Sequence, residues 1–395
     1  MRPLPFLSAL LATSASAIQI QVDYTYDTDG YFDIPERRQA LEAAAQFYSD
    51  LLSDNLLRVD PSEFPGGSWT VFVSNPQTGA TESLPNPVVP EDILIVFAGA
   101  RELGGTVRGQ GGTSGYSGFG SAAAWFSRIR ARGNPGADVN DDSLATDFAP
   151  SFGFVTFDIT TDFNFSSTPH PTKTDFIPVA LHEFAHVLGI GTAASWDNLI
   201  NSNTFTGPAV VQSAGSAPAV QTGGGHFDQS VSNKPAYGSF GTPHGSSGAV
   251  MMRPSLTGSS GGLTVATDLD LAGLLDIGWE VSPPAIVEIV NLGPSATELE
   301  WPSSSFLDYV VEKDTDLDFS NASQFSFSGD GFVKSWTDPA PPAGKAFYRL
   351  VSEPFGPAAV PAAPSAPLRT EQVNEGLMTV YVAPRWVEGC GCSDH

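Results

Sequence analysis

The stretch LHEFAHVLG, residues 181–189, decides how this chain is interpreted. Its apolar residues and the terminal Gly189 predict a buried helix that ends at the glycine. Helical residues four apart lie on one face, so His182 and His186 can bind one metal ion together. Glu183 lies beside them, where a carboxylate can accept a proton from water. The spacing therefore predicts a zinc site that activates water for hydrolysis.

Two histidines on an apolar helix can also be ordinary core residues. Here, however, they flank Glu183, and an unpaired carboxylate on such a helix is costly unless a metal is close by. A catalytic zinc takes three protein ligands and keeps one open position. In the compact metzincin motif, which residues 182–189 resemble, the third ligand lies three residues after the glycine; that position here is Thr192, which cannot replace a histidine. The remaining candidates are His170, His226, His244 and His395.

Later motifs follow the first in a recognisable order. They are GHFD at residues 225–228, MRP at 252–254 and LLDIGW at 274–279. Together with His-Glu-x-x-His-x-x-Gly, this order resembles the leishmanolysin-like branch of the metzincins over roughly residues 20–281. The resemblance implies that His226 is the third zinc ligand and that Met252 forms the methionine turn beneath the metal. His244, nearer the methionines, is the rival ligand, and His170 lies between two prolines in an expected loop.

The resemblance implies an α+β zincin (metzincin) catalytic domain, with a mixed twisted sheet and an active-site helix. It also implies a zinc endopeptidase that cleaves proteins or peptides, with Glu183 as general base. An extended substrate would pair with an edge strand, for which 153–159 is the candidate; an interior strand is the alternative. Two rival interpretations are an inactive zincin-scaffold binding protein, and a structural metal site closed by His244 as fourth ligand.

Composition shifts divide the chain into four parts. Residues 1–17 read as a secretory signal peptide, because an apolar run follows Arg2 and small residues precede Ile18. Residues 18–282 are the expected catalytic domain, and 283–352 an Ig- or fibronectin-like β-sandwich. Residues 353–395 form a Pro- and Ala-rich linker and tail. The sequence thus predicts a secreted protein.

Several secondary-structure elements are expected within these parts. Helices are expected over 35–53, 121–132, 175–188 and 267–277, the last with a capping box from Thr267 and Asp270. A glycine-rich loop is expected over 104–120; it lacks the Gly-Lys-Ser/Thr ending of a phosphate loop. Strands are expected over 18–26, 69–73, 92–97, 153–159, 285–292, 297–301, 308–312, 323–328 and 345–351.

Charge and cysteine content exclude some partners. The formal net charge of −25 should repel nucleic acid and anionic membranes. After residue 17 no run of about 18 apolar residues predicts a membrane span. The acidic loops at Asp138, Asp141 and Asp142, and at Asp314, Asp316 and Asp318, are candidates for structural Ca²⁺, although solvated turns are the simpler interpretation. Cys390 and Cys392 either belong to a disordered tail or block the zinc site before processing.

Overall fold

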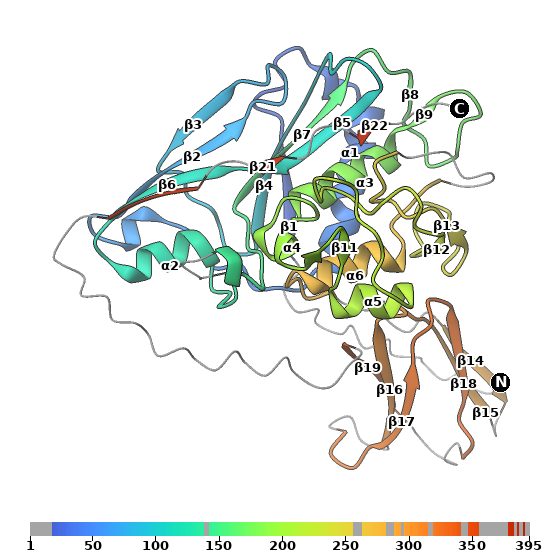
Figure 1. Ribbon diagram of the computed structural model, residues 1–395. Coiled ribbons are helices and arrows are strands. Elements are labelled where there is room, and N and C mark those ends of the chain that lie inside the picture. Colours follow the sequence, from blue (N-terminus) through green and yellow to red (C-terminus); the bar gives the residue numbers. More distant parts are fainter. Residues whose placement is uncertain are drawn as a thin grey trace, which may run out of the picture.

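The computed structural model describes most of the chain, with gaps (Figure 1). The described residues are 18–137, 142–255, 263–281, 288–293, 296–314, 319–340, 347–354, 378–382, 385–386 and 390–391. The expected signal peptide at 1–17 lies outside these ranges. Within them, no helix combines the length and the apolar character that crossing a bilayer requires.

A mixed sheet forms the centre of the molecule. Its strands run in the order β1 (Gln19–Asp23), β4 (Ile93–Arg101), β7 (Phe152–Asp158) and β5 (Val107–Thr113). The first three are parallel, whereas β5 is antiparallel to β7. This arrangement places β7 inside the sheet, so the expectation that 153–159 provides an edge is wrong. The strand beyond it is β5.

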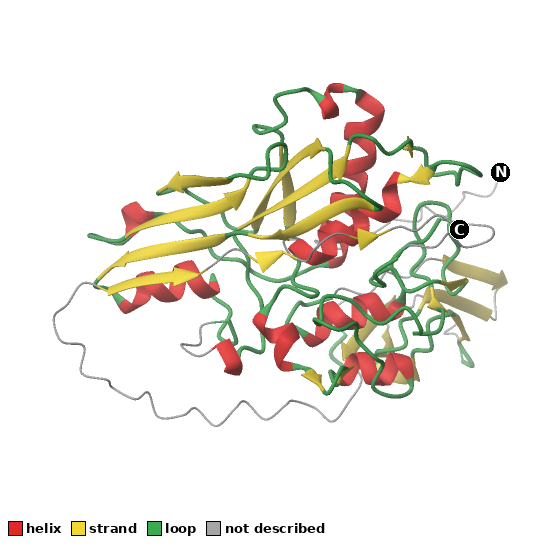
Figure 2. Ribbon diagram, turned by 45° about the horizontal axis from the view of Figure 1, so that its top comes forward, coloured by secondary structure: helices red, strands yellow, loops and turns green. Residues whose placement is uncertain are grey.

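The two faces of this sheet pack against different cores. Successive side chains of a strand point to opposite faces, so Phe154 joins one cluster and Val155 the other. The larger core lies against α1 (Pro35–Leu51) and α3 (Phe176–Val187), which pack side by side under the sheet (Figures 1 and 2). Both helices match the predicted ranges within two residues.

A second sheet continues from the first. Its order is β20 (Met378–Val382), β6 (Gly115–Gly120), β2 (Ser68–Ser74) and β3 (Thr81–Pro85). Helix α2 (Ala123–Ala131) packs against β6. The prediction of a loop over 104–120 is therefore wrong, because β5 and β6 occupy most of that range.

Close packing explains the glycines that suggested a loop. A Cβ at Gly111 would lie 2.2 Å from the backbone oxygen of Glu183, and one at Gly109 would lie 2.6 Å from its Oε1. The two glycines are two residues apart and face the same side of β5. Only residues without a Cβ allow the strand to come this close to α3. The glycines here reflect strand–helix contact and not turn conformation.

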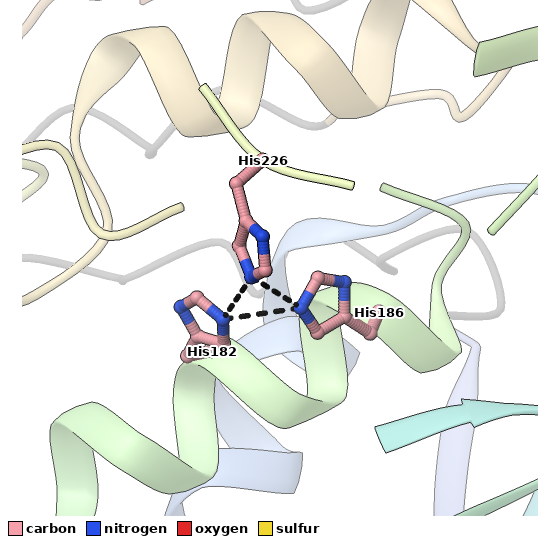
Figure 3. A group of neighbouring side chains, drawn as sticks. All are labelled: His182, His186 and His226. Atoms are coloured by element: carbon pink, nitrogen blue, oxygen red, sulfur yellow. Dashed lines mark hydrogen bonds between the residues drawn. The ribbon is translucent and has the colours of Figure 1, made fainter. Parts of the chain in front are cut away.

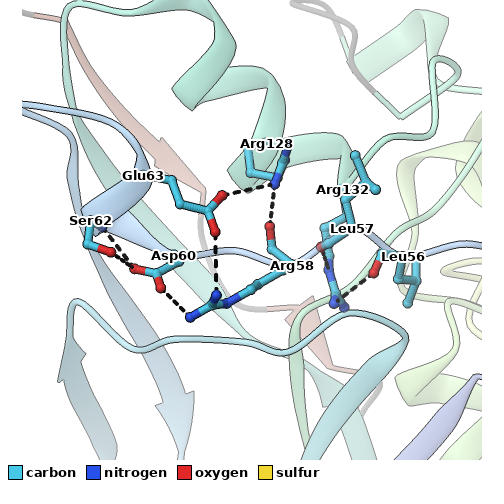
Figure 4. A network of polar contacts seen from close by, with 8 residues as sticks. All are labelled: Leu56, Leu57, Arg58, Asp60, Ser62, Glu63, Arg128 and Arg132. Atoms are coloured by element: carbon cyan, nitrogen blue, oxygen red, sulfur yellow. Dashed lines mark hydrogen bonds and ion pairs between the residues drawn. The ribbon is translucent and has the colours of Figure 1, made fainter.

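The guanidinium of Arg132 fixes the loop at 56–63 to α2 and the first sheet (Figure 4). Arg132 is fully buried, and its nitrogens donate to the carbonyl oxygens of Leu57, Ile93, Pro150, Leu56 and Pro90. Desolvation lowers its pKa to about 10, so the side chain stays charged near neutral pH. On the surface, Arg58 pairs with Asp60 and Glu63, and Glu63 also pairs with Arg128.

The chain after α3 is built from short elements. They are α4 (Ala194–Asn198), β10 (Ile200–Asn201), β11 (Thr204–Phe205), α5 (Pro208–Ala214), β12 (Lys234–Pro235) and β13 (Ser247–Gly248). Helix α6 (Asp268–Asp276) closes the domain and packs on α5. It begins with the predicted capping box, in which Thr267 and Asp270 satisfy each other's polar groups.

Two three-stranded antiparallel sheets follow. One has the order β14 (Glu288–Gly293), β15 (Ala296–Pro302), β18 (Val333–Thr337), and the other β17 (Ser323–Ser328), β16 (Leu307–Asp314), β19 (Phe347–Pro354). Five of these strands overlap the predicted ones; β18 was not predicted. Asp268 accepts a hydrogen bond from the Ser305 backbone at 2.8 Å, and His244 contacts the Ser303 carbonyl at 2.8 Å. These contacts join the sheets to the preceding domain.

Three further strands lie near the C-terminus. Besides β20 they are β21 (Arg385–Trp386) and β22 (Cys390–Gly391), and both pair antiparallel with β5. In Figure 1 they run in red-brown along β6 and beside β5. Cys390 and Gly391 thus form a strand where a disordered tail was the favoured expectation, and Cys392 lies outside the described residues. The remaining short elements are the turns η1 (Tyr31–Asp33), η2 (Pro61–Glu63) and η3 (Asp142–Leu144), and the pair β8 (Phe163–Asn164) and β9 (Thr174–Asp175).

Candidate metal centre

Three histidine side chains converge in the interior (Figure 3). His182 and His186 come from successive turns of α3, and His226 comes from the loop before β12. Their Nε2 atoms form a nearly equilateral triangle: 3.1 Å separates His182 from each of the other two, and 3.2 Å separates His186 from His226. All three rings are almost completely buried. This group can hold a metal ion.

The outer nitrogen of each ring faces an oxygen. His182 Nδ1 lies 2.8 Å from the Met251 carbonyl, and His186 Nδ1 lies 2.7 Å from the Ile190 carbonyl. His226 Nδ1 lies 3.0 Å from Oε1 of Gln221. Carbonyl oxygens only accept, so each Nδ1 carries the proton. The three Nε2 lone pairs therefore point toward one another, as metal ligands do.

Burial keeps the three rings neutral. Desolvation lowers the pKa of His182 to about 4 and that of His186 to about 3. The pKa of His226 is also lowered well below its usual value, again mainly by desolvation. A neutral imidazole is the form that binds a metal, so the site is in its binding form near neutral pH.

Glycines after α3 set the position of His186 and His226. Gly189 adopts a φ of 107°, which reverses the chain and brings the Ile190 carbonyl back to His186. Gly191 has a φ of 74°, and a Cβ there would lie 2.2 Å from the Gly225 carbonyl oxygen. Both positions need glycine, and together they let the segment before His226 lie against the end of α3.

Asp270 connects the methionine pair to α6. Its carboxylate accepts hydrogen bonds from the backbone of Met251 at 3.0 Å, Met252 at 2.9 Å and Thr267 at 2.8 Å. The Met251 carbonyl in turn faces His182, and the Met252 carbonyl accepts from the Phe227 backbone at 2.9 Å. The turn at Met251 and Met252 thus contacts His182 on α3 and the loop that carries His226. Both methionine side chains are fully buried.

The residue predicted as the base, Glu183, lies on α3 between the first two histidines and is 1 % exposed. Strand β5 passes close to it, since a Cβ at Gly109 would lie 2.6 Å from its Oε1 and one at Gly111 2.2 Å from its backbone oxygen. The carboxylate is therefore enclosed between the helix and the sheet edge, in a region of low dielectric where its charge interacts strongly with nearby groups.

The structure separates the predicted ligands from the alternatives. It brings His226, and not His244, to His182 and His186. His244 lies against Ser303, and His170 lies in the exposed turn before β9. Thr192 donates its hydroxyl to the His186 carbonyl at 2.6 Å. His395 lies outside the described residues.

The candidate calcium ligands are largely beyond what the structure describes. Asp138, Asp141, Asp316 and Asp318 fall in its gaps. The carboxylate of Asp314 accepts from the Asn321 backbone at 3.0 Å. The side chains of Cys390 and Cys392 are likewise not described.

The nitrogen triangle fits a tetrahedral ion. Two ligands at the usual Zn–N distance of 2.0–2.1 Å lie about 3.3 Å apart in tetrahedral geometry. The observed separations of 3.1–3.2 Å are within about 0.2 Å of that value. Among the described residues, no other histidine, cysteine or carboxylate joins the three histidines.

Sequence reasoning missed several supporting residues. Gln221 orients His226 and also donates its backbone N–H to the His226 carbonyl at 2.9 Å, but nothing in the sequence marks it. The hydroxyl of Tyr48 donates to the Leu181 carbonyl at 2.9 Å, and the indole of Trp279 to the Leu188 carbonyl at 2.7 Å. The sequence marks Asp270 only as part of a capping box and does not indicate its contacts with Met251 and Met252.

Comparison with known proteins identified no relative of this chain. No protein-family model matches the chain, and no match was found among the curated proteins or the solved structures.

Proposed function

We propose that this protein is a zinc-dependent endopeptidase of the metzincin type. The observation that carries the proposal is the buried triangle of three Nε2 atoms, with each Nδ1 facing an oxygen, on the helix that also carries the buried Glu183. Imidazole ligands suit zinc, and three of them leave a fourth position for water or substrate. The order of sequence motifs supports the same assignment.

The residues would act as follows. His182, His186 and His226 would hold the zinc. A zinc ion held there would supply a Lewis acid, which lowers the pKa of water toward 7 and polarises a carbonyl group. Glu183 would accept the proton of that water and later pass it to the amine that leaves. Met251, Ile190 and Gln221 keep the three rings oriented through their oxygens, so little reorganisation is needed when the metal binds.

Two observations bear on the rival interpretations. A structural zinc is closed by a fourth protein ligand, and in the described part of the chain the metal group consists of the three histidines alone. An inactive binding protein has no need for Glu183 at this buried position. The proposal is therefore preferred to a purely structural or purely binding role.

The test is hydrolysis of unfolded casein by zinc-loaded protein. We expect cleavage by the unaltered chain and a loss of about 10²–10⁴-fold in Glu183→Gln, as for removal of a general base. Glu36→Gln, at an exposed position on α1, is the matched control and should cleave normally. Zinc content is measured in all three proteins. Undiminished cleavage by zinc-bound Glu183→Gln would refute the proposal.

A further inference from the structure

Strand β5 is the outer strand of the central sheet and lies above the candidate base. Its inner side pairs with β7, from Gly109 opposite Phe157 to Thr113 opposite Gly153. Its outer side pairs only with β21 and β22 among the described strands. This outer side is the sheet edge adjacent to Glu183, because Gly109 approaches the carboxylate and Gly111 the backbone of that residue.

The C-terminal strands pair antiparallel along this edge, with a shift of register at β22. Arg385 lies opposite Thr113, Trp386 opposite Gly112 and Cys390 opposite Gly109. Further from the site, β20 pairs with β6, with Met378 opposite Gly120 and Val382 opposite Tyr116. The three described strands therefore lie antiparallel along β6 (β20) and along β5 (β21 and β22). Cys390 lies opposite Gly109, the β5 residue that approaches the Glu183 carboxylate.

An extended peptide binds a sheet edge by adding a strand, and its backbone supplies most of the hydrogen bonds. The edge of β5 has the features of such a site: it is the outer edge of a sheet, and it lies beside the catalytic carboxylate. A substrate that pairs there would have its backbone where β21 and β22 now lie. Substrate and C-terminal segment cannot occupy this edge together.

We propose that strands β21 and β22 act as a built-in competitor that occupies the peptide-binding edge of β5 and must leave before a substrate can pair there. The inhibitory effect of this segment rests on the proposed endopeptidase function. The pairing of β21 and β22 with β5 does not. A segment in the same chain competes at a high effective concentration. Release, by displacement or by proteolytic cleavage before residue 378, would then raise activity.

The test uses the full chain with Arg385→Pro and Trp386→Pro together. Successive N–H groups of a strand point to opposite sides, so one of residues 385 and 386 directs its N–H toward β5. Proline has no N–H, and replacing both residues therefore removes a hydrogen bond of the ladder. The matched control carries Ala362→Pro and Ala363→Pro in the Pro- and Ala-rich stretch. Hydrogen–deuterium exchange of the β5 amides is measured for both proteins with Glu183→Gln added, so that this readout does not depend on catalysis.

We expect faster exchange of the β5 amides in the Arg385/Trp386 variant, and unchanged exchange in the control. With Glu183 intact, casein cleavage should rise about tenfold if the tail holds the edge in about nine of ten molecules. A synthetic peptide of residues 378–395 should restore slow exchange and inhibition, whereas the same peptide with a reversed sequence should not.

The outcomes separate the two proposals. Unchanged β5 exchange in the proline variant would overturn the pairing. If the unaltered chain cleaves casein, faster exchange with unchanged or lower cleavage would overturn the competition and make the segment a structural strand. Faster exchange, reversed by the peptide, in a zinc-loaded protein that never cleaves casein would support the occupied edge and refute the endopeptidase assignment.

Discussion

Asp270→Ala should weaken metal binding although the side chain touches no ligand atom. The carboxylate holds the backbone of Met251, whose carbonyl faces His182, and that of Met252, whose carbonyl accepts from Phe227 beside His226. Loss of the carboxylate releases this turn. Residues that orient metal ligands typically contribute 10–100-fold to metal affinity, and we expect a decrease of about that size.

The same change also lowers stability. Three buried backbone N–H groups, those of Met251, Met252 and Thr267, would lose their acceptor. Each unsatisfied donor costs about 1–3 kcal/mol. The native carboxylate itself carries a desolvation cost, since burial raises its pKa. The expected net loss in unfolding free energy is therefore about 3–5 kcal/mol, which a domain of ordinary stability can survive.

Asp276→Ala is the matched control. Asp276 lies at the other end of the same helix, and its carboxylate accepts two backbone hydrogen bonds at 2.8 Å, from Ala209 and Val210. It should reduce stability by a comparable mechanism without altering the metal site. Zinc affinity is measured by competition with a chromophoric chelator, and stability by urea denaturation. Folded Asp270→Ala with unaltered zinc affinity, or an equal loss in Asp276→Ala, would refute the reasoning.

Three further changes test separate features. His226→Ala should abolish zinc retention after dialysis while His244→Ala retains it, because His244 lies against Ser303; equal retention in both would remove His226 from the site. Gly111→Ala should cost about 1–3 kcal/mol of unfolding free energy, because its Cβ would meet the Glu183 backbone, whereas Gly248→Ala has its nearest contact at 3.5 Å and should unfold normally in urea. Burial raises the pKa of Asp54 to about 7, so the folded chain keeps a proton that the unfolded chain loses above about pH 4. Its contribution to stability therefore falls as pH rises from 4 to 7, and Asp54→Asn should gain about 4 kcal/mol relative to the unaltered chain over that interval. Urea denaturation at pH 4 and pH 8, with exposed Asp29→Asn as control, checks this; an equal difference at both pH values would contradict it.

The parts of the site that lie on one continuous element could be predicted from sequence. Residues 181–189 carry their own periodicity, and two ligands four apart need no tertiary information. The position of His226 depended on the resemblance, because a ligand 40 residues away is brought in by the path of a loop. That path is set by contacts such as Gly191 against Gly225, which a single sequence does not display.

The main error had a physical cause. Glycine is common in turns, so a run with glycines at 109, 111, 112, 115, 118 and 120 was interpreted as a loop. In the fold, Gly109 and Gly111 make room for α3, and Gly118 makes room for Ile129, where a Cβ would lie 2.4 Å from its Cδ1. Because β5 was not predicted, β7 was expected to be the edge of the sheet. For the same reason, the sequence indicated no strand with which the C-terminal strands could pair.

The separation of the ligands along the chain has a mechanical consequence. His186 and His226 are 40 residues apart, and the chain between them carries only short helices and a two-residue hairpin. An ion bound to both would act as a crosslink that closes this loop. The entropy of closing a flexible loop of this length corresponds to about 3 kcal/mol, and an ion that stayed bound during unfolding would restrict the unfolded chain by about that amount. Removal of the ion would then loosen the segment from α4 to α5 before it loosens the sheet.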